Sequence, residues 1–311
     1  MGTTRGIMNT SRSNVRFSPK IDYFTISTTH RVSRAQIDRF EGKAIYPRSM
    51  ANTALTIHDP TKSDIELAAS YYPHSSLTEV EIAIDIRPRS ASTQEEHLCA
   101  LTEIKSEWIA KCLTPALPAP SQGGFRAAYL PLGSHGYPQR FNSRVPGLSE
   151  QLLYGHRTHP IQVKVYHKHL DQRKALSRDE RSIRLEVRLS GEGLRRHGLD
   201  QPLDLLGFPY RKALMPYLRH AKGVELRERR ARPPSEVIAL ARKTIERHHA
   251  DRWERYGVGA FEEGGCSDHS DVKRRRFTEM NDRLGQALTR LEQTLRNENR
   301  AQWRSSRAIK P

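Results

Sequence analysis

The sequence predicts an α+β fold: an antiparallel sheet, which could consist of two similar halves, with flanking helices and a basic helical C-terminal region. Two observations predict it. Several segments alternate between apolar and polar residues, as the half-buried strands of an antiparallel sheet do. Between and after these segments, apolar residues recur at helical spacing, and the last third of the chain is also rich in Lys and Arg.

Four segments are expected to form strands. The ordered fold should begin near Ile21, because residues 22–28 are rich in aromatic and β-branched residues. Residues 77–87, 161–168 and 182–190 alternate over their whole length. Each of these three places branched apolar residues on one face and charged or polar residues on the other. We therefore expect a sheet with one apolar face and one polar face.

Helices are expected in four regions. Thr93 and Glu96 fit a capping box, and apolar residues at helical spacing follow as far as Cys112. After residue 193 the pattern becomes helical again, and Ser235 is expected to cap a further helix. The last helix carries a stripe of leucines that predicts a docking face rather than a coiled coil, formed by Leu284, Leu288, Leu291 and Leu295.

The chain is expected to divide into three parts. Residues 1–20 carry four basic residues, no acid and little apolar content, which indicates a disordered basic tail. Residues 21–206 hold the strands and form the main domain, interrupted by a Pro- and Gly-rich connector at 114–147 with one short strand at 125–130. Residues 207–311 form the basic helical region, for which we expect a role in DNA binding or docking.

The composition favours a nucleic acid as partner. The 311 residues include 52 Lys and Arg against 35 Asp and Glu, a formal charge of +17, and such a field attracts polyanions. No run approaches the roughly 20 apolar residues of a membrane span, and residues 1–20 lack the apolar segment of a signal peptide. We therefore expect a cytoplasmic protein with no membrane partner. Three widely spaced cysteines exclude a disulfide scaffold and a four-cysteine zinc site.

The polar face of the predicted sheet carries an acidic stripe. Glu79, Glu81 and Asp85 project from the same face of one strand. Glu186 would join them if its strand lies beside the first. Clustered carboxylates repel each other unless a cation lies between them, and their oxygens suit Mg²⁺ or Mn²⁺. The sequence therefore indicates a metal site on this face, formed by Glu79, Glu81 and Asp85 together with Glu186.

A tyrosine on the same predicted face could supply a nucleophile. Tyr166 lies between Lys164 and Lys168 on its strand, and neighbouring ammonium groups are expected to lower the pKa of its phenol and to hold a phosphate. A metal, a tyrosine and basic residues together suit attack of the hydroxyl on a DNA phosphodiester. The alternative interpretation is that the acids are solvated surface and the tyrosine is a packing residue.

These residues lie in motifs that resemble a known family. Segments 165–170, 182–189, 194–199 and 202–205 follow the order seen in replication initiators of filamentous phages, the gene II type, and of rolling-circle plasmids. The family's tyrosine-x-lysine segment matches Tyr166 and Lys168, and its arginine-x-glutamate-x-arginine segment matches Arg184, Glu186 and Arg188. Its acidic strand aligns with residues 79–81 and 85, although Glu81 replaces the usual aspartate and Glu79 replaces an arginine.

The resemblance implies a site-specific nicking endonuclease and strand transferase that acts on supercoiled, double-stranded origin DNA through a 5′-phosphotyrosine intermediate. In this hypothesis residues 21–206 are the nicking domain, and Tyr166 is the nucleophile. The metal-binding residues are Glu81, Asp85 and Glu186, and the residues that neutralise the transition state are Lys164, Lys168, Arg184 and Arg188. Mg²⁺ or Mn²⁺ is the implied cofactor, and a host helicase and polymerase are the implied further partners.

Two other functions fit the same residues. A non-catalytic DNA-binding regulator or structural protein would use the basic helices without breaking DNA. A conjugative relaxase would share the chemistry and act on other DNA. The motif His167-Lys168-His169 contains metal-ligand types, but both histidines should lie on the face opposite Tyr166. We therefore expect them to be structural or to contact phosphate.

Overall fold

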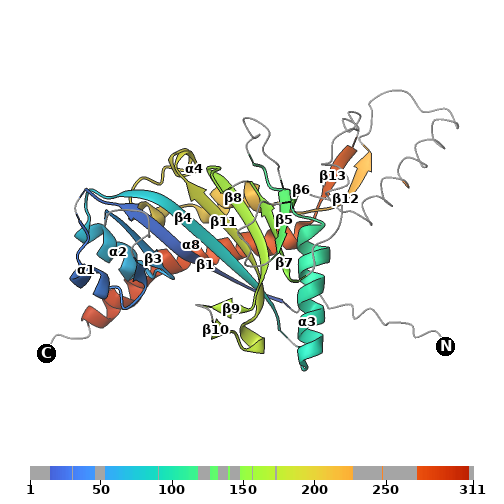
Figure 1. Ribbon diagram of the computed structural model, residues 1–311, viewed down its shortest axis with the longest axis horizontal. Coiled ribbons are helices and arrows are strands. Elements are labelled where there is room, and N and C mark those ends of the chain that lie inside the picture. Colours follow the sequence, from blue (N-terminus) through green and yellow to red (C-terminus); the bar gives the residue numbers. More distant parts are fainter. Residues whose placement is uncertain are drawn as a thin grey trace.

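The fold is described from a computed structural model, which covers residues 15–29, 31–45, 53–89, 91–117, 127–131, 139–140, 148–155, 157–171, 174–226, 247 and 272–307. A single large antiparallel sheet organises these residues (Figure 1). Its strands, in spatial order, are β2 (Ala44–Ile45), β3 (Ala54–His58), β1 (Val15–Ser27), β4 (Ser76–Pro88), β11 (Ser182–Ser190), β8 (Ile161–Lys168), β7 (Glu150–Tyr154), β5 (Ala127–Pro131) and β6 (Gln139–Arg140). The predicted α+β class and antiparallel sheet are confirmed.

Two small strand pairs and a set of helices complete the described part. The pairs are β9 (Leu170–Asp171) with β10 (Lys174–Ala175) and β12 (Ala221–Leu226) with β13 (Val272–Arg276). The α-helices are α1 (Arg34–Asp38), α2 (Lys62–Tyr71), α3 (Gln94–Glu103), α4 (Glu192–Arg196), α5 (Asp204–Gly207), α6 (Tyr210–Leu214) and α8 (Thr278–Arg307). A π-helical segment (Ile104–Ala110) continues α3, and 3₁₀ turns occupy Arg178–Glu180 and Met215–Leu218. None of the described helices is long and apolar enough to cross a membrane.

Alternation along the central strands separates a core face from a polar face. Ile82, Val187 and Val163 lie side by side on β4, β11 and β8, and each is at most 1% exposed. Helix α8 packs against β1 on this side and passes behind the sheet in Figure 1. The predicted leucine stripe of α8 is buried in the same core, with Leu284 and Leu288 fully enclosed. The stripe is thus a docking face for the chain's own sheet.

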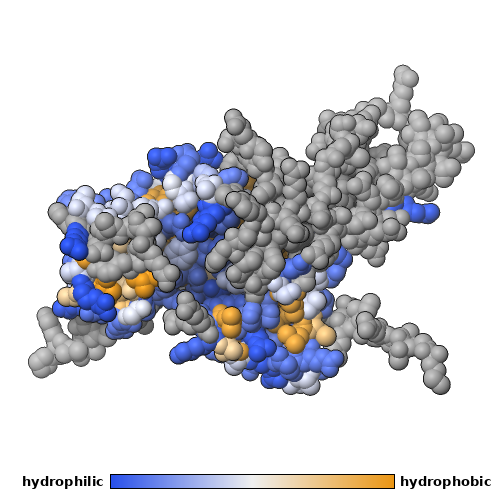
Figure 2. Space-filling view, viewed as in Figure 1, coloured by the Kyte–Doolittle hydropathy of each residue, from blue (hydrophilic) through white to orange (hydrophobic). Residues whose placement is uncertain are grey.

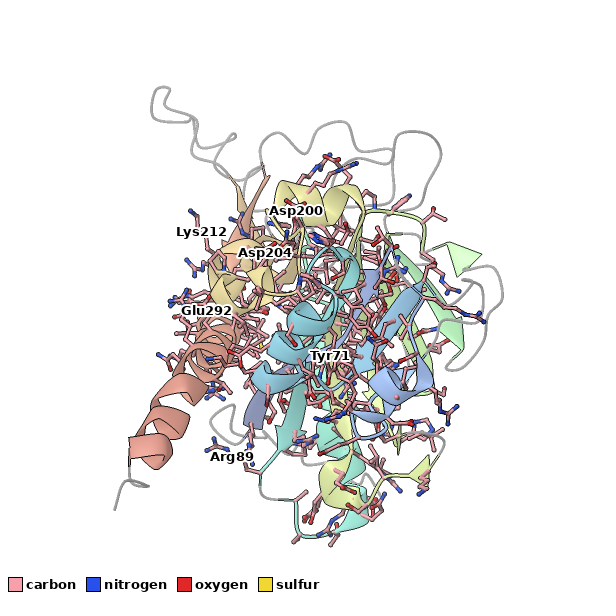
Figure 3. All side chains as sticks on the ribbon, turned by 90° about the vertical axis from the view of Figure 1, so that its left-hand side faces the viewer. Tyr71, Arg89, Asp200, Asp204, Lys212 and Glu292 are labelled. Carbon is pink, nitrogen blue, oxygen red and sulfur yellow. The ribbon has the colours of Figure 1, made fainter. Side chains whose placement is uncertain are left out.

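Short helices join α8 to the rest of the core. The backbone N–H of Arg211 in α6 donates to the Glu292 carboxylate of α8 over 2.8 Å. Figure 3 shows Lys212 and Glu292 on these two neighbouring helices. At the start of α5, the Asp204 carboxylate accepts from the backbone N–H groups of Asp200 and Gln201. These polar contacts fix the helices that cover one edge of the apolar face.

The structure corrects two boundaries of the sequence-based division. Strand β1 begins at Val15, six residues before the expected start, because Val15 and Phe17 are buried against the core and pair with Pro88 and Ile86 of β4. Residues 15–20 therefore belong to the sheet and not to a disordered tail. The boundary at 206/207 does not separate the core, because α8 packs on the sheet.

Other expectations have mixed outcomes. The capping box at Thr93 and Glu96 is present, and β5 overlaps the short strand expected at 125–130. The sequence suggested that the sheet could consist of two similar halves. From the centre outward, one half runs β4, β1, β3 and the other runs β11, β8, β7, so the two halves differ in connectivity. Residues 1–14 of the basic tail, the helix expected from Ser235 and most of the connector lie outside the described residues.

Lys105 is a buried cation that should make stability depend on pH. Its residue is 1% exposed, and its ammonium donates to the backbone carbonyls of Leu148 and Glu150. Burial lowers the pKa of Lys105 to about 8, opposed by the negative charge of Glu150. Between pH 8 and 10.5 the unfolded chain binds more protons at this site than the folded chain does. The free energy of unfolding should therefore rise with pH in this window, by up to about 3 kcal/mol.

Urea unfolding of the wild type and of Lys105→Met at pH 7.5 to 10.5 tests this dependence. The stability difference between the two proteins should change with pH, because the variant lacks the titrating ammonium. Parallel profiles would show that Lys105 titrates at its ordinary pKa.

Candidate functional site

The candidate site lies on the polar face of the central strands. Register places Glu186 of β11 between Ala83 of β4 and Lys164 of β8. In the next row, Arg184 lies between Asp85 and Tyr166. The small side chain of Ala83 leaves room beside Glu186. Alternation along three neighbouring strands therefore brings these charged residues together on one face of the sheet.

A β-bulge in β1 adds a residue that the sequence pattern did not reveal. Ile21 pairs with Ile82 and Tyr23 pairs with Glu81, so Asp22 is the extra residue between two pairs. A bulge of this kind lets two successive side chains share a face. Asp22 and Tyr23 accordingly both contact groups of the polar face, whereas Phe24 is buried in the core. Simple alternation would have placed Asp22 with Phe24.

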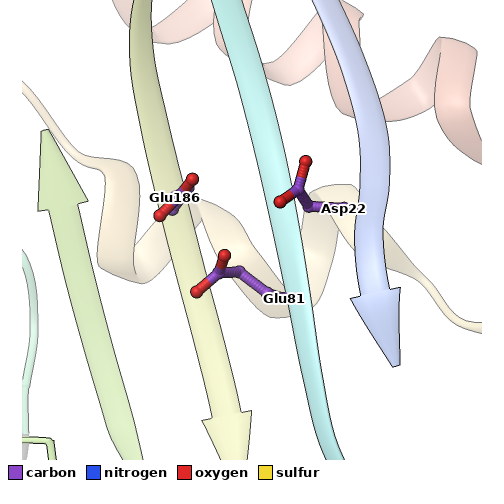
Figure 4. A group of neighbouring side chains, drawn as sticks. All are labelled: Asp22, Glu81 and Glu186. Atoms are coloured by element: carbon purple, nitrogen blue, oxygen red, sulfur yellow. The ribbon is translucent and has the colours of Figure 1, made fainter. Parts of the chain in front are cut away.

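Three carboxylates from three strands meet at this point. The carboxylate oxygens of Asp22, Glu81 and Glu186 lie within 4.8 Å of one another. They project from the face opposite the helices (Figure 4). Glu81 is 3% exposed and Glu186 is 2% exposed, so neither is a solvated surface acid. Burial, followed by the charge of Glu186, raises the pKa of Glu81 to about 8.

Three cations, Lys164, Arg184 and Lys20, lie within ion-pair distance of these acids. The Lys164 ammonium donates to Glu81 over 2.7 Å and to Glu186 over 3.1 Å. Burial alone would lower the pKa of Lys164, but the two carboxylates outweigh it and raise the pKa. The Arg184 guanidinium donates to Asp22 over 2.7 Å. Arg184 and Lys20 thereby hold the pKa of Asp22 below its ordinary value, although burial opposes them.

The Tyr166 hydroxyl points at the same carboxylates. It donates to Glu186 Oε1 over 2.6 Å, a short and charge-assisted contact. Burial and then the charge of Glu186 raise the pKa of Tyr166. The expectation that Lys164 and Lys168 lower this pKa is wrong, because Lys164 is engaged with the two glutamates and Lys168 with Asp171. A nucleophilic Tyr166 would therefore need a base, and Glu186 is in contact with its proton.

Asp85 is not part of the three-carboxylate group. Arg184 Nε and Nη2 donate to its two oxygens over 2.7 and 2.9 Å, and Ser182 donates over 3.1 Å. The Arg184 hydrogen bonds lower the pKa of Asp85 despite its burial. Of the predicted metal ligands, the structure thus brings Glu81 and Glu186 together and replaces Asp85 by Asp22.

The remaining predicted residues flank the group. Lys168 Nζ lies 3.0 Å from Asp171. Arg188 Nη1 lies 3.7 Å from Glu79, and Arg188 also donates to the carbonyl of Arg157. Neither cation contacts the three carboxylates. Both lie on the same two strands as Glu186 and Tyr166, one or two rows along the sheet.

A second tyrosine lies on the same face. The Tyr23 hydroxyl donates to Glu79, and burial followed by the charges of Glu81 and Glu79 raises the pKa of Tyr23. Tyr23 therefore resembles Tyr166 in its burial and in having a glutamate as acceptor. Its acceptor, however, is outside the group formed by Asp22, Glu81 and Glu186.

His167 lies on the other face of β8, as the alternation predicts. It pairs with Ile183 of β11, is 8% exposed, and its ring lies 5.3 Å from that of His169. Burial and then the neighbouring His169 lower the pKa of His167 to about 4. It is a neutral, buried side chain near neutral pH and does not reach the three carboxylates.

The three-carboxylate group fits a hard divalent ion. Its donors are all carboxylate oxygens, the ligands that Mg²⁺ and Mn²⁺ prefer, and they come from three adjacent strands. The Lys164 ammonium already contacts two of the three carboxylates, so an ion would compete with it.

Comparisons with known proteins are sparse. No protein-family profile matches the chain, and no curated protein matches its sequence. A solved structure of the rolling circle replication initiator protein from Geobacillus stearothermophilus superposes on 75% of this chain and 97% of that chain. The TM-score is 0.36 and the sequence identity is 11%. A likeness at this level does not assign the chain to a family.

Proposed function

We propose that this chain is a DNA nicking and joining enzyme that initiates rolling-circle replication, with Tyr166 as its nucleophile. The observation that carries the proposal is the 2.6 Å hydrogen bond from the Tyr166 hydroxyl to buried Glu186, next to two further carboxylates. A tyrosine with a base in contact and a cluster of metal-binding donors has the groups that phosphoryl transfer needs. The family motifs at residues 165–170 and 182–189 support the same function.

The chemical step is a transesterification. The Tyr166 oxygen bonds to the scissile phosphorus while its proton passes to Glu186, which already accepts that hydrogen bond. The bond from phosphorus to the 3′ oxygen breaks, and this oxygen leaves with a proton from solvent. The tyrosine is then joined to the 5′ phosphate, and the reverse reaction rejoins the strand without any oxidant or energy source.

The positive groups of the face would offset charge on the phosphoryl oxygens. Arg184 lies in the same row as Tyr166, and Lys164 lies in the same row as Glu186. Lys168 and Arg188 flank these rows. Fixed cations in a partly buried site stabilise developing negative charge more than they would in water. Asp22, Glu81 and Glu186 would hold Mg²⁺ or Mn²⁺, which supplies polarisation of a phosphoryl oxygen when bound.

The test is to incubate the purified chain with supercoiled DNA of its own replicon and Mg²⁺ or Mn²⁺. We expect nicked circles with covalently attached protein, and none in EDTA. Salt-sensitive DNA binding without nicking, with both metals, would instead support the non-catalytic DNA-binding alternative.

Metal binding can be tested separately from nicking. Lys164→Met removes an ammonium that contacts Glu81 and Glu186, so we expect it to tighten Mn²⁺ binding by about tenfold, an order-of-magnitude value for one lost competing charge. Glu186→Gln should weaken binding. Calorimetric titration measures both effects. Lys168→Met is the matched control, because this lysine of the same strand pairs with Asp171 instead. Equal Mn²⁺ affinity in all three variants and the wild type would contradict the metal assignment.

A further inference from the structure

A basic groove lies where helix α8 crosses the first half of β1. Residues 15–20 of β1 pair with β4 on one side, whereas pairing with β3 begins only at Tyr23. Helix α8 passes along this unpaired edge, and its Arg290 donates to the carbonyl of Phe17 over 3.0 Å. The groove between them has a volume of about 830 Å³. It is separate from the three-carboxylate group.

The groove differs from the candidate site in its charge. Its described lining contains six cations and no Asp or Glu: Arg16, Lys20, Lys62, Arg89, Arg283 and Arg290. In the candidate site, by contrast, cations and acids alternate. The cations of the groove come from both of its walls, strand β1 and helix α8, and from its rim. Figure 3 shows Arg89 at the end of β4, on the side of the molecule along which α8 runs.

The groove cations differ in how far the described residues neutralise them. Arg16 and Arg89 are exposed and form no ion pair with any residue that the structure describes. Lys62 is 3% exposed, and its ion pair with Glu66 is long, at 3.6 Å. Holding a nearly buried ammonium with one distant partner costs free energy that a bound anion would recover. The charge of the groove therefore favours binding of a ligand with several negative charges.

One end of the groove leads to the candidate site. Lys20 lines the groove, and its ammonium lies 3.1 Å from Asp22, a member of the three-carboxylate group. A chain of phosphates in the groove would thus arrive beside the proposed nicking site. The candidate site itself lies on the polar face of the sheet. Figure 2 shows that this face is hollowed and mainly hydrophilic.

We propose that this groove binds the phosphodiester backbone of single-stranded DNA next to the nicking site; the inference rests on the proposed function. A volume of 830 Å³ lies within the range of about 300–1,000 Å³ that encloses a small ligand, so the groove has room for a short stretch of one strand. The lining aromatic residue, Phe17, is 7% exposed and offers no stacking surface. Binding should therefore depend on phosphate charge and not on base sequence.

The test measures DNA binding by the full chain in EDTA, so that cleavage cannot contribute. The binding result can then be interpreted even if the nicking proposal fails. A triple variant, Arg16→Gln with Arg89→Gln and Arg283→Gln, removes three groove cations. The matched control removes three exposed cations elsewhere, by Arg39→Gln with Lys174→Gln and Lys212→Gln. Fluorescence anisotropy measures binding of a labelled oligothymidine and of a duplex of equal length as salt is varied. Circular dichroism and thermal unfolding check that both variants fold.

We expect the groove variant to bind oligothymidine about a hundredfold more weakly at 0.1 M salt, with a salt slope smaller by about 2, from roughly 0.7 per phosphate contact on a single strand. The control variant should stay close to the wild type. Equal losses in both variants, or no loss in either, would overturn the assignment to the groove. A loss of duplex binding with unchanged oligothymidine binding would overturn the choice of single-stranded DNA.

Discussion

Replacing Tyr166 by Phe is expected to lower the rate of DNA nicking by at least about 1,000-fold, as loss of a nucleophile does in covalent catalysis, while DNA affinity stays unchanged. The change removes one oxygen and one hydrogen bond, the 2.6 Å contact to Glu186. The fold should tolerate it, because an ordinary hydrogen bond contributes about 1 kcal/mol. Gel assays of supercoiled DNA under single-turnover conditions measure the rate.

Tyr23→Phe is the matched control for this experiment. Tyr23 lies on the same face, is similarly buried and also donates to a glutamate, but to Glu79. Its loss should change stability as much as the loss of the Tyr166 hydroxyl and leave nicking intact. Nicking that survives in Tyr166→Phe and disappears in Tyr23→Phe would move the nucleophile to β1.

Replacing Arg184 by Met is expected to lower the free energy of unfolding by about 3–5 kcal/mol, the usual cost of removing one member of a buried ion pair. Arg184 is 2% exposed and donates to both Asp85 and Asp22. Without it, two largely buried carboxylates lose their main partner. Urea unfolding at pH 7 measures the change. Arg195→Met, at an exposed ion pair with Glu192, should change stability by less than about 1 kcal/mol.

A second variant separates a charge effect from a packing effect at this position. Asp85→Asn in the Arg184→Met background removes one of the stranded charges and should recover part of the lost stability. If the double variant is no more stable than the single one, the cost of losing Arg184 lies in packing and not in unpaired carboxylates.

The strands and their faces could be predicted from the sequence because alternation is a local signal. The structure places β8 and β11 over the residues that the pattern indicated, and Tyr166 and Glu186 share the polar face. The early start of β1 was missed because residues 15–20 contain Pro19 and two cations. Their burial depends on α8, which lies more than 250 positions away in sequence.

The composition of the carboxylate group could not be predicted in full. Glu81 and Asp85 have the same alternation, and only the register with β11 decides that Asp85 faces Arg184. Asp22 enters the group through a bulge, which leaves no mark in an alternating pattern. Likewise, the two lysines beside Tyr166 suggested a lowered pKa for its phenol. In the structure, Lys164 pairs with Glu81 and Glu186 and Lys168 pairs with Asp171, so their charges are engaged with these acids.

The basic character of the C-terminal third was visible in the sequence, but its arrangement was not. Apolar spacing predicted that the leucines of α8 dock, and they lie in the core of the sheet. The same helix then presents Arg283 and Arg290 to a groove shared with β1. Composition could indicate a polyanion as partner, whereas the location of the groove required the packing of two distant segments.

Mapping the covalent protein–DNA adduct tests the central claim most directly. After reaction with supercoiled DNA and Mg²⁺ or Mn²⁺, nuclease and trypsin digestion leave a nucleotide on the peptide that carried out the attack, and mass spectrometry locates it. The account predicts a 5′-phosphoryl nucleotide on Tyr166, in the tryptic peptide of residues 165–168. An adduct on Tyr23 or on any other residue, or nicked DNA free of covalent protein, would contradict it.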